Sequence, residues 1–514
     1  MGRVILTKGD FFCSPNTRFK FGVTSNGDLA LFEGSSRIWS ANTCCTGEDV
    51  TATLQVDGNL AVITSSSKVL WESHSSSLDI DLASLIVGDD GIVTITDTKM
   101  GHVWSSAINE EERVVSDSLQ AKVMAGYQGW FFAQGDGALN YWVHWSRSRQ
   151  IPNKDSVTID AWPDLRELDD DELYPTGFRY TDGSNARLYS AYNAKTVERH
   201  TQWMKDYGVD GVFVQRFIGT AVAKHWTRVV DKVLANVRSG AEKYGRTFVT
   251  MYDIGNGNAT TIVQDVINDW KHLVDDEHIT KSKQYLRHRG RPLVAIWGFG
   301  FYDRLGTPDQ VAEIIDWFKN KAESKYKVTL MGGVPAGWRD LSRDSKTDAA
   351  WASIYRSYDV ISPWTVGRYG DIRTANNFRS RYVEPDMAEC RSLGIDYLPV
   401  VFPGFSFRNL YPEKPFNEIP RNGGTFMWHQ MYNVVAAGSK MIYVAMFDEV
   451  DEATAIFKLA QNLQQTPTEG RFLTSNFDQG YSNCPNDWYL NITGRVSGLL
   501  RQGKDVPLNM PAYP

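Results

Sequence analysis

The sequence lacks the features that would indicate a membrane protein or a nucleic-acid-binding protein. It contains no uninterrupted apolar run of about 18 residues, the length that a membrane-spanning helix needs. Basic side chains are not in excess, since 54 Lys and Arg against 61 Asp and Glu leave a formal net charge of -7. A negative chain has no electrostatic attraction for nucleic acid or anionic lipid. We therefore expect neither a nucleic acid nor a membrane among its partners.

Cysteine is scarce too. The chain has 5 Cys, none in metal-ligand spacing, and Cys44 directly precedes Cys45. A disulfide between neighbours would be strained, so reduced thiols are the simplest interpretation. The N-terminus MGRVILTKGDFF has no apolar signal core and no small-residue cleavage site. We expect a cytoplasmic protein, or a secreted one if a leader has been removed.

Motifs for bound cofactors are also missing. No G-x-G-x-x-G follows a predicted strand, and no G-x-x-x-x-G-K-[ST] occurs, which argues against a nucleotide. No His, Cys and Asp combination stands where a metal would be expected, so we predict no metal and no cofactor. Aromatic residues, in contrast, reach 12% of the chain. Such rings stack on the apolar faces of sugars, although large β-rich cores also use them.

At 514 residues the chain is too long for one ordinary domain. Three segments near the N-terminus end alike, and their tryptophans, Trp39, Trp71 and Trp104, lie 32 and 33 residues apart. An Asn-Gly or Asp-Gly turn between alternating apolar residues precedes each of the three. Such turns are the strongest short-range hairpin signals. The repeat predicts a pseudo-threefold all-β structure with the tryptophans at a shared centre.

The opening KGDFFCSPNTRFKFGVTSNGDLALF resembles the bulb-type, or monocot mannose-binding, lectins, and the resemblance covers residues 1–110. It implies a β-prism, each of whose three faces can hold a mannose pocket of the pattern Q-x-D-x-N-x-V-x-Y. The polar pocket positions are occupied by Gln55, Asp57 and Asn59 in the second repeat and by Asn26 and Asp28 in the first. Ile63 replaces the pocket Tyr, which removes one hydrogen bond to a sugar. A module retained only as a spacer or for dimerisation is the alternative.

After a charged linker at 111–122, short apolar strands alternate with amphipathic helices, a pattern typical of a parallel sheet built from β–α units. The strand candidates are VMAGYQGWF, DGVFVQRF, TFVTMYDI, RPLVAIWGF, KVTLMGGV, DVISPWTV, DYLPVVFPG and KMIYVAMFDEV. Eight strands predict a (β/α)8 TIM barrel over residues 123–505. The fold class is therefore multidomain, with an all-β domain followed by an α/β barrel. A doubly wound open sheet is the alternative.

In a (β/α)8 barrel the functional face lies at the C-terminal ends of the strands. The residues expected there are aromatic or polar with few bases, which suits a neutral polyol. The predicted substrate-binding residues are Tyr127, Trp130, His144, Gln215, Arg216, Tyr252, Asp253, Trp297, Trp364 and Phe405. For each ring taken singly, core packing is the alternative.

The last strand candidate leads directly into four acids, Asp448, Glu449, Asp451 and Glu452. Cleavage of a glycosidic bond uses two carboxyl groups, about 5–5.5 Å apart in retaining enzymes and farther apart in inverting ones. Side chains three residues apart on one turn have Cβ atoms about 5–6 Å apart, so Glu449 and Glu452 have a suitable spacing. Their mutual repulsion in a partly dry site would raise one pKa and provide a protonated acid. A solvated acidic loop is the alternative, because E-x-x-E is common.

AGYQGWF at the first strand and FDEVDEATAI at the last resemble the glycoside hydrolase family 71/99-like group, relatives of endo-α-1,2-mannosidase, over most of residues 120–460. The family motif reads roughly F-[ND]-E-[WY]-[HD]-E-G-T. The resemblance implies that Glu449 acts as a base on the 2-hydroxyl of the sugar, giving a 1,2-anhydro intermediate with retention, and that Glu452 is the acid/base. Val450 stands where the family has an aromatic ring, and Ala453 replaces Gly.

Together these patterns predict a glycoside hydrolase that cleaves α-linked mannose or a related α-glycan with Glu449 and Glu452 as catalytic residues. The lectin-like module would hold the enzyme on its glycan. Glycans are the expected partners, and the lectin module is a possible site of homo-oligomerisation. The alternative is a chimeric lectin for defence or recognition, whose barrel binds glycans without cutting them.

Overall fold

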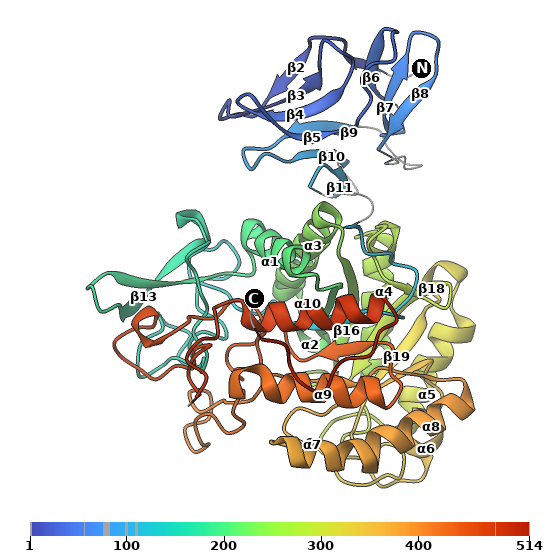
Figure 1. Ribbon diagram of the computed structural model, residues 1–514. Coiled ribbons are helices and arrows are strands. Elements are labelled where there is room, and N and C mark those ends of the chain that lie inside the picture. Colours follow the sequence, from blue (N-terminus) through green and yellow to red (C-terminus); the bar gives the residue numbers. More distant parts are fainter. Residues whose placement is uncertain are drawn as a thin grey trace. The chain divides into compact units, whose positions relative to one another are not determined.

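The computed structural model describes residues 3–55, 57–73, 75, 83–97, 101–107, 112–478 and 480–512 (Figure 1). The chain divides into two compact units. The N-terminal unit comprises Met1–Val114 with Ala241–Gly245, and the C-terminal unit comprises Val115–Gly240 with Arg246–Pro514. None of the described helices combines the length and the apolarity that crossing a membrane requires.

Three antiparallel sheets make up most of the N-terminal unit. The first has the order β1 (Arg3–Leu6), β6 (Val50–Leu54), β7 (Leu60–Thr64) and β8 (Val69–Glu72). The second has the order β2 (Phe11–Cys13), β3 (Phe19–Val23), β4 (Leu29–Glu33) and β5 (Ser36–Ser40). The third has the order β11 (Gly101–Ser105), β10 (Val93–Asp97) and β9 (Ala83–Val87).

One turn geometry recurs in the three sheets, where the sequence predicts hairpins. Gly27, Gly58 and Gly91 have φ of 87°, 81° and 76°, a left-handed conformation that glycine adopts without a steric cost. Each of these glycines donates its N–H to the carbonyl three residues earlier, at 2.9, 2.9 and 3.1 Å. The hairpins β3–β4, β6–β7 and β9–β10 are thus confirmed, and so is the threefold repeat of one turn.

The three repeat tryptophans meet at the centre of the N-terminal unit. The ring centroids of Trp39 and Trp71 lie 5.6 Å apart, and Trp104 lies 5.7 Å from each of them, always edge to face. Aromatic pairs favour this geometry because the positive ring edge meets the negative face. The predicted shared centre is confirmed.

A sheet of parallel strands forms the middle of the C-terminal unit. Its order is β21 (Asp396–Tyr397), β20 (Val360–Pro363), β19 (Thr329–Val334), β18 (Arg291–Trp297), β16 (Thr247–Asp253), β15 (Gly211–Phe217), β12 (Val123–Tyr127), β23 (Ile442–Val444) and β22 (Val400–Val401). Each of the eight predicted strand segments contributes to it, and DYLPVVFPG contributes the two short strands β21 and β22. Parallel strands buried on both faces need such near-continuous apolar runs.

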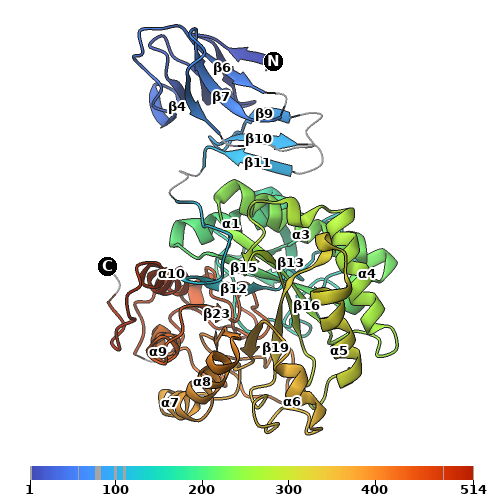
Figure 2. The same cartoon turned by 90° about the vertical axis from the view of Figure 1, so that its right-hand side faces the viewer.

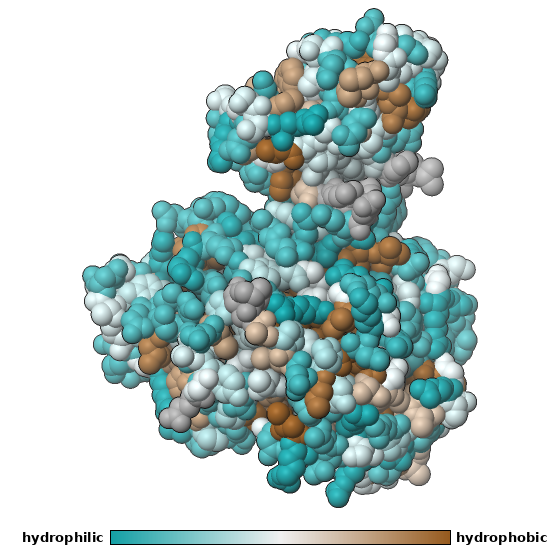
Figure 3. Space-filling model, viewed as in Figure 1, coloured by the Kyte–Doolittle hydropathy of each residue, from teal (hydrophilic) through white to brown (hydrophobic). Residues whose placement is uncertain are grey.

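Helices surround this sheet in the view of Figure 2. They are α1 (Ala194–Tyr207), α2 (Ile218–Ala221), α3 (Lys224–Tyr244), α4 (Ile262–Asp275), α5 (Pro308–Asp316), α6 (Ala350–Tyr355), α7 (Ile372–Phe378), α8 (Glu384–Leu393), α9 (Thr425–Ala436) and α10 (Trp488–Arg501). An additional hairpin, β13 (Leu173–Arg179) with β14 (Asn185–Tyr189), lies between β12 and α1 in the sequence. On the face shown in Figure 3, hydrophilic residues predominate and apolar ones form small scattered groups.

The last strand is shorter than the sequence predicts, and this positions the acids. β23 ends at Val444, and the chain then folds back on itself instead of continuing as a strand. Met446 N–H donates to the Thr454 carbonyl at 3.1 Å, and Thr454 N–H donates to the Glu449 carbonyl at 3.0 Å. Ala453 lies in this turn with φ of 51°, the left-handed region that the glycine of the family motif would favour. The acids therefore stand on a compact turn tied to the end of the strand.

Candidate active site

The acids that follow β23 are buried, which rules out a solvated loop. Asp448, Glu449 and Asp451 are only 1%, 4% and 1% exposed, and Glu452 is partly buried. Charged carboxylates are almost never buried to this degree unless the protein supplies partners. The partners of each acid therefore show what the cluster is built to do.

Glu449 is held by one donor on each carboxyl oxygen. The Gln128 side-chain amide donates to Oε1 at 2.8 Å, and the Thr454 hydroxyl donates to Oε2 at 2.7 Å. Gln128 follows β12 and Thr454 ends the acidic turn, so the two donors come from opposite ends of the unit's sequence. Hydrogen bonds to a carboxylate stabilise its charged form and fix its orientation.

Asp448 joins the first strand of the sheet to the last. Its carboxyl oxygens accept the backbone N–H groups of Gln128 and Gly129 at 2.7 and 2.9 Å. Burial raises the pKa of Asp448 to about 7, although these two donors act in the opposite direction. Asp448 thus anchors the loop that carries the Gln128 side chain beside Glu449.

Two glutamates of the cluster have strongly altered acidity. Burial, and then the charges of Glu452 and Asp451, raise the pKa of Glu449, whereas the Thr454 hydroxyl lowers it. Burial and the Asp451 charge raise the pKa of Glu452 to about 8. A raised pKa favours the protonated form of a carboxyl at neutral pH, which is the form that a general acid needs.

Asp451 connects the cluster to an aromatic stack. His144 Nδ1–H donates to Asp451 Oδ2 at 2.9 Å, and the other Asp451 oxygen is buried without a partner among the described residues. The His144 ring lies parallel to Trp130, with centroids 3.8 Å apart and planes 6° apart. Trp130 stacks in turn on Phe217 at 5.4 Å. His144 has φ of 58°, so the protein holds this ring in an uncommon backbone conformation.

The structure brings several predicted substrate-binding residues into two groups. Trp130, His144, Gln215 and Arg216 line one cavity together with Gln128. Trp297 and Trp364 form an edge-to-face pair with centroids 5.5 Å apart, and both are partly buried.

Asp253 lies at the end of β16. Its Oδ1 accepts Gly255 N–H at 2.6 Å, and burial raises its pKa to about 6, opposed by that backbone donor and by Arg304. The Arg304 guanidinium in turn stands over the Trp297 ring at 5.3 Å. Arg304 is therefore a neighbour of both Asp253 and the Trp297–Trp364 pair.

Two predicted substrate-binding tyrosines are buried against the helices around the sheet. Tyr127 and Tyr252 are 1% and 0% exposed. The Tyr127 hydroxyl is hydrogen-bonded to His200 of α1 at 3.0 Å, and the Tyr252 hydroxyl donates to Asp269 of α4 at 2.8 Å. These two predictions are wrong, because both side chains project outward from the sheet to the helices that cover it.

Phe405 is partly buried and packs against Phe407, with ring centroids 4.6 Å apart. Its backbone N–H and carbonyl form a pair of hydrogen bonds with the backbone of Ile419, at 2.9 and 3.0 Å.

Val450, where the family motif has an aromatic ring, is fully buried. Its carbonyl accepts the N–H groups of Asp160 and Ala161, so this position fastens the turn to a neighbouring loop.

The polar residues of the predicted lectin sites cluster at hairpin turns. Asn59 is 6% exposed; its Oδ1 accepts from Ser73, and its Nδ2 donates to Gln55 Oε1 at 3.4 Å. Asp57 Oδ1 accepts Asn59 N–H at 3.1 Å. Gln55 and Asp57 are the more accessible members of this trio.

The first repeat uses its polar residues in the same way. Asp28 is 2% exposed and accepts from Thr43 N–H, the Ser40 hydroxyl and Arg37 at 2.9, 2.6 and 3.1 Å. Asn26, in contrast, is exposed and accepts the Thr24 hydroxyl. Asp28 and Asn59 thus serve equivalent structural roles, since each secures a hairpin turn to the next strand.

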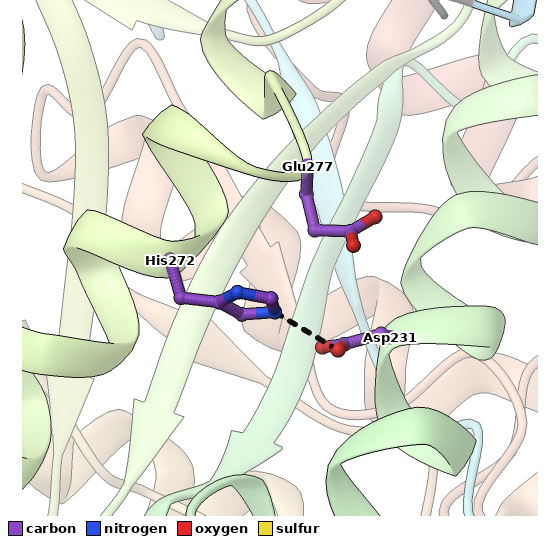
Figure 4. A group of neighbouring side chains, drawn as sticks. All are labelled: Asp231, His272 and Glu277. Atoms are coloured by element: carbon purple, nitrogen blue, oxygen red, sulfur yellow. Dashed lines mark hydrogen bonds and ion pairs between the residues drawn. The ribbon is translucent and has the colours of Figure 1, made fainter.

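Two groups of side chains in the described part of the chain have the composition of metal ligands. One is Asp231, His272 and Glu277 on and after α3 and α4 (Figure 4). Asp231 is already paired with Arg216 at 2.8 Å and with His272 Nε2 at 3.0 Å. The other, Asp169 with Asp171 and Glu172, is paired with Lys195 and Arg199. In both groups, acids are thus already paired with Arg, Lys or His side chains of the protein.

Comparison with known proteins identifies relatives of both units. No family model matches the chain. The GH99 endo-α-mannosidase from Bacteroides thetaiotaomicron superposes with a TM-score of 0.53 and 14% identity, covering 75% of this chain and 99% of that chain. This similarity shows the fold of the C-terminal unit.

A mannose-specific lectin from Aloe arborescens is 32% identical over 59 residues, and the match covers 54% of that protein. The chain thus spans about half the length of this curated relative. A monomeric monocot mannose-binding lectin from Gastrodia elata matches 20% of this chain at 25% identity with a TM-score of 0.19. Both resemblances that the sequence indicates, to a mannose-binding lectin and to a GH99-type glycosidase, are confirmed.

Sequence reasoning missed the residues that hold Glu449. Gln128 belongs to the AGYQGWF segment and Thr454 to the acidic motif, but neither was assigned a role. The signal for Gln128 was its place after a parallel strand next to β23, since strand ends of a parallel sheet meet at one edge.

Proposed function

We propose that this protein is a retaining glycoside hydrolase that cleaves α-linked mannose or a related α-glycan with Glu449 and Glu452. The observation that carries the proposal is the buried acid pair: Glu449 is clamped by Gln128 and Thr454, and burial beside Asp451 gives Glu452 a pKa of about 8. A structural acid needs no such arrangement, whereas glycoside cleavage requires one charged and one protonated carboxyl.

The hydrogen bonds support distinct roles for the two glutamates. Glu449 has a donor on each oxygen, and donors stabilise a negative charge. Burial and the Asp451 charge raise the pKa of both carboxyls, but the Glu452 carboxyl has no hydrogen bond to any residue that the structure describes, so no donor offsets its shift. We therefore place the negative charge on Glu449 and the shared proton on Glu452.

These charge states give a reaction sequence. Glu452 donates its proton to the departing glycosidic oxygen as the bond to the anomeric carbon breaks. Glu449 takes the proton of the sugar's 2-hydroxyl, whose oxygen closes on the anomeric carbon from the opposite side. Water then opens the resulting three-membered ring, with Glu452 acting as base and Glu449 returning its proton. Two inversions at one carbon give net retention.

The rest of the strand-end rim suits a neutral glycan. Asp253, Trp297, Trp364 and Phe405 offer one carboxyl and three rings, and rings of this kind stack on the apolar faces of sugars. The N-terminal unit adds a second glycan contact through Gln55 and Asp57, the accessible polar residues of the second repeat.

The proposal includes a more detailed fold. The three sheets and the central tryptophans support a β-prism. In the C-terminal unit β21 pairs with β20 and β22 pairs with β23, and only two residues separate β21 from β22. The sheet thus begins and ends on one short stretch, which supports a closed (β/α)8 barrel. Domain limits of 1–110 and 123–505 remain our proposal.

Replacing either acid tests this function. Glu449→Gln and Glu452→Gln should each lower the hydrolysis of an α-mannan or a high-mannose oligosaccharide by at least about 1,000-fold, because each removes one step of the proton transfer. Glu469→Gln, at an exposed position, is the matched control. The anomeric form of the first product, read by NMR, tests retention. Full activity in either variant overturns the assignment, and glycan binding without hydrolysis by the wild type would indicate a chimeric lectin.

A further inference from the structure

A cavity of about 290 Å³ lies beside the acid cluster, where β15 faces α3. Val214 and Phe217 on the strand, and Val230, Val233 and Leu234 on the helix, contribute much of its apolar lining. The exposed Asn256 also lines it, so the cavity reaches the surface. A water molecule occupies about 30 Å³ of liquid, so this space is far larger than a single hydration site.

Five polar atoms of the residues that line this cavity are buried without a hydrogen-bond partner among the described residues. Two are donors, Trp130 Nε1 and Arg216 Nη1, two are acceptors, Gln128 Oε1 and Gln215 Oε1, and the Thr250 hydroxyl can do either. Buried polar atoms are almost always paired, and each unpaired one costs about 1–3 kcal/mol. A balanced set of donors and acceptors matches hydroxyl groups, which both donate and accept.

The charge in this wall favours a neutral ligand. Arg216 is 2% exposed, and Asp269 accepts from its Nε and Nη2, both at 2.7 Å. Asp231 accepts from the same Nη2 at 2.8 Å and also contacts His272 (Figure 4). Two carboxylates therefore already neutralise the guanidinium, which offers its remaining N–H groups but no spare positive charge for an anion.

We propose that this cavity is a seat for one neutral hydroxylated ring, a single pyranose unit. The aliphatic and aromatic side chains contact the C–H faces of the ring, while small rotations let the five unpaired groups bond its hydroxyls. The choice of a sugar rests on the proposed function, but the seat itself is separate from the acid pair. Gln128 connects the two, because its amide N–H holds Glu449 while its Oε1 remains for the ligand.

The test uses the full-length protein with methyl α-D-mannopyranoside as the probe. Crystals soaked in the probe should show one ring in this cavity, whatever the N-terminal unit binds. Val230→Trp fills the space and should weaken the calorimetric binding event assigned to the cavity at least about tenfold. Trp130→Phe keeps the ring but removes its N–H, and should weaken the same event about fivefold. Val69→Trp, on an exposed face of β8, is the control for an added tryptophan.

Binding in the cavity is measured without hydrolysis, so the outcomes that overturn the proposal do not depend on activity. Ordered water alone in the soaked cavity overturns it, and so does unchanged binding in both Val230→Trp and Trp130→Phe. Entry of toluene without entry of the mannoside would make this an apolar site and also overturn it. If the acid-pair variants stay active while the ring occupies the cavity, the proposed catalytic roles fail but the binding site stands.

Discussion

At the scale of single residues, the proposed function depends on how the protein controls charge on Glu449. Its carboxylate has two donors, and the longer side chain, Gln128, reaches it from a different strand end. The neighbouring His144 and Asp451 pair makes the surroundings polar without adding a donor to Glu449. The Gln128 amide is therefore the single group whose loss should change Glu449 most selectively.

Gln128→Met keeps the length of the side chain and removes the donor. With one hydrogen bond fewer on the charged form, the pKa of Glu449 should rise further, since burial already raises it. The rising, acidic limb of the pH profile of kcat/KM should move to higher pH, and activity near neutrality should fall about tenfold. Gln120→Met, at an exposed position, is the control. An unmoved acidic limb would contradict the role of Gln128.

Glu452 gives a prediction about stability. Its folded-state pKa of about 8 lies above the unfolded value of about 4.3, so the folded protein binds this proton more tightly. That contribution is fully present below the unfolded pKa and is lost as pH rises through 8. Glu452→Gln should therefore exceed the wild type in unfolding free energy by about 4–5 kcal/mol at pH 8, with little difference near pH 4.5.

Urea unfolding at the two pH values measures this effect. The exposed Glu418→Gln should show no such pH-dependent gain, because it lies outside the buried cluster. A Glu452→Gln variant that is equally stable or less stable than the wild type at pH 8 would show that the proton is not held as proposed.

At the scale of strands and helices, the sequence predicted where each strand runs but not which way its side chains face. Apolar runs ending in polar residues located all eight strand segments, because a buried parallel strand must be apolar on both faces. Side-chain direction alternates, so one residue of shift exchanges core and ligand-facing positions. Tyr127 and Tyr252 were wrongly predicted for this reason, whereas Gln215 and Asp253, each next to an outward-facing residue, stay predictions.

The acidic turn after β23 shows a second limit of prediction from the sequence. Its composition and spacing were legible in FDEVDEATAI, but the early end of β23 and the fold-back to Thr454 depend on contacts from distant segments. The Gln128 contact with Glu449 spans more than three hundred residues, and one sequence cannot indicate such a pair. Polar residues at adjacent strand ends were the nearest available signal.

The Arg216 network tests how β15 is fastened to its helices. Asp269 of α4 accepts two bonds from this buried guanidinium and a third from Tyr252. Asp269→Asn leaves the arginine without part of its compensating charge, and should lower the unfolding free energy by about 3 kcal/mol or more. Asp265→Asn, one turn earlier on the same helix, should cost less than about 1 kcal/mol. Chemical unfolding of both variants checks this, and equal effects would contradict it.

At the scale of the whole molecule, the two glycan contacts that we propose for one chain would have a consequence that neither has alone. Once the N-terminal unit holds a glycan, the C-terminal unit meets further sites on that glycan at a raised effective concentration. This benefit exists only for a substrate long or dense enough to be held at both places. Substrate size therefore separates tethering from catalysis.

The double variant Gln55→Ala with Asp57→Ala removes the two accessible polar residues of the second repeat while keeping the buried Asn59. Its kcat/KM on a soluble oligosaccharide should equal that of the wild type, because the acid pair is unchanged. On immobilised mannan its rate should fall about tenfold through lost tethering. Lys68→Ala, in the turn between β7 and β8, should leave both rates unchanged. Equal losses on both substrates would mean that the variant damages the enzyme itself, and no loss on either would mean that the N-terminal unit does not tether the protein to mannan.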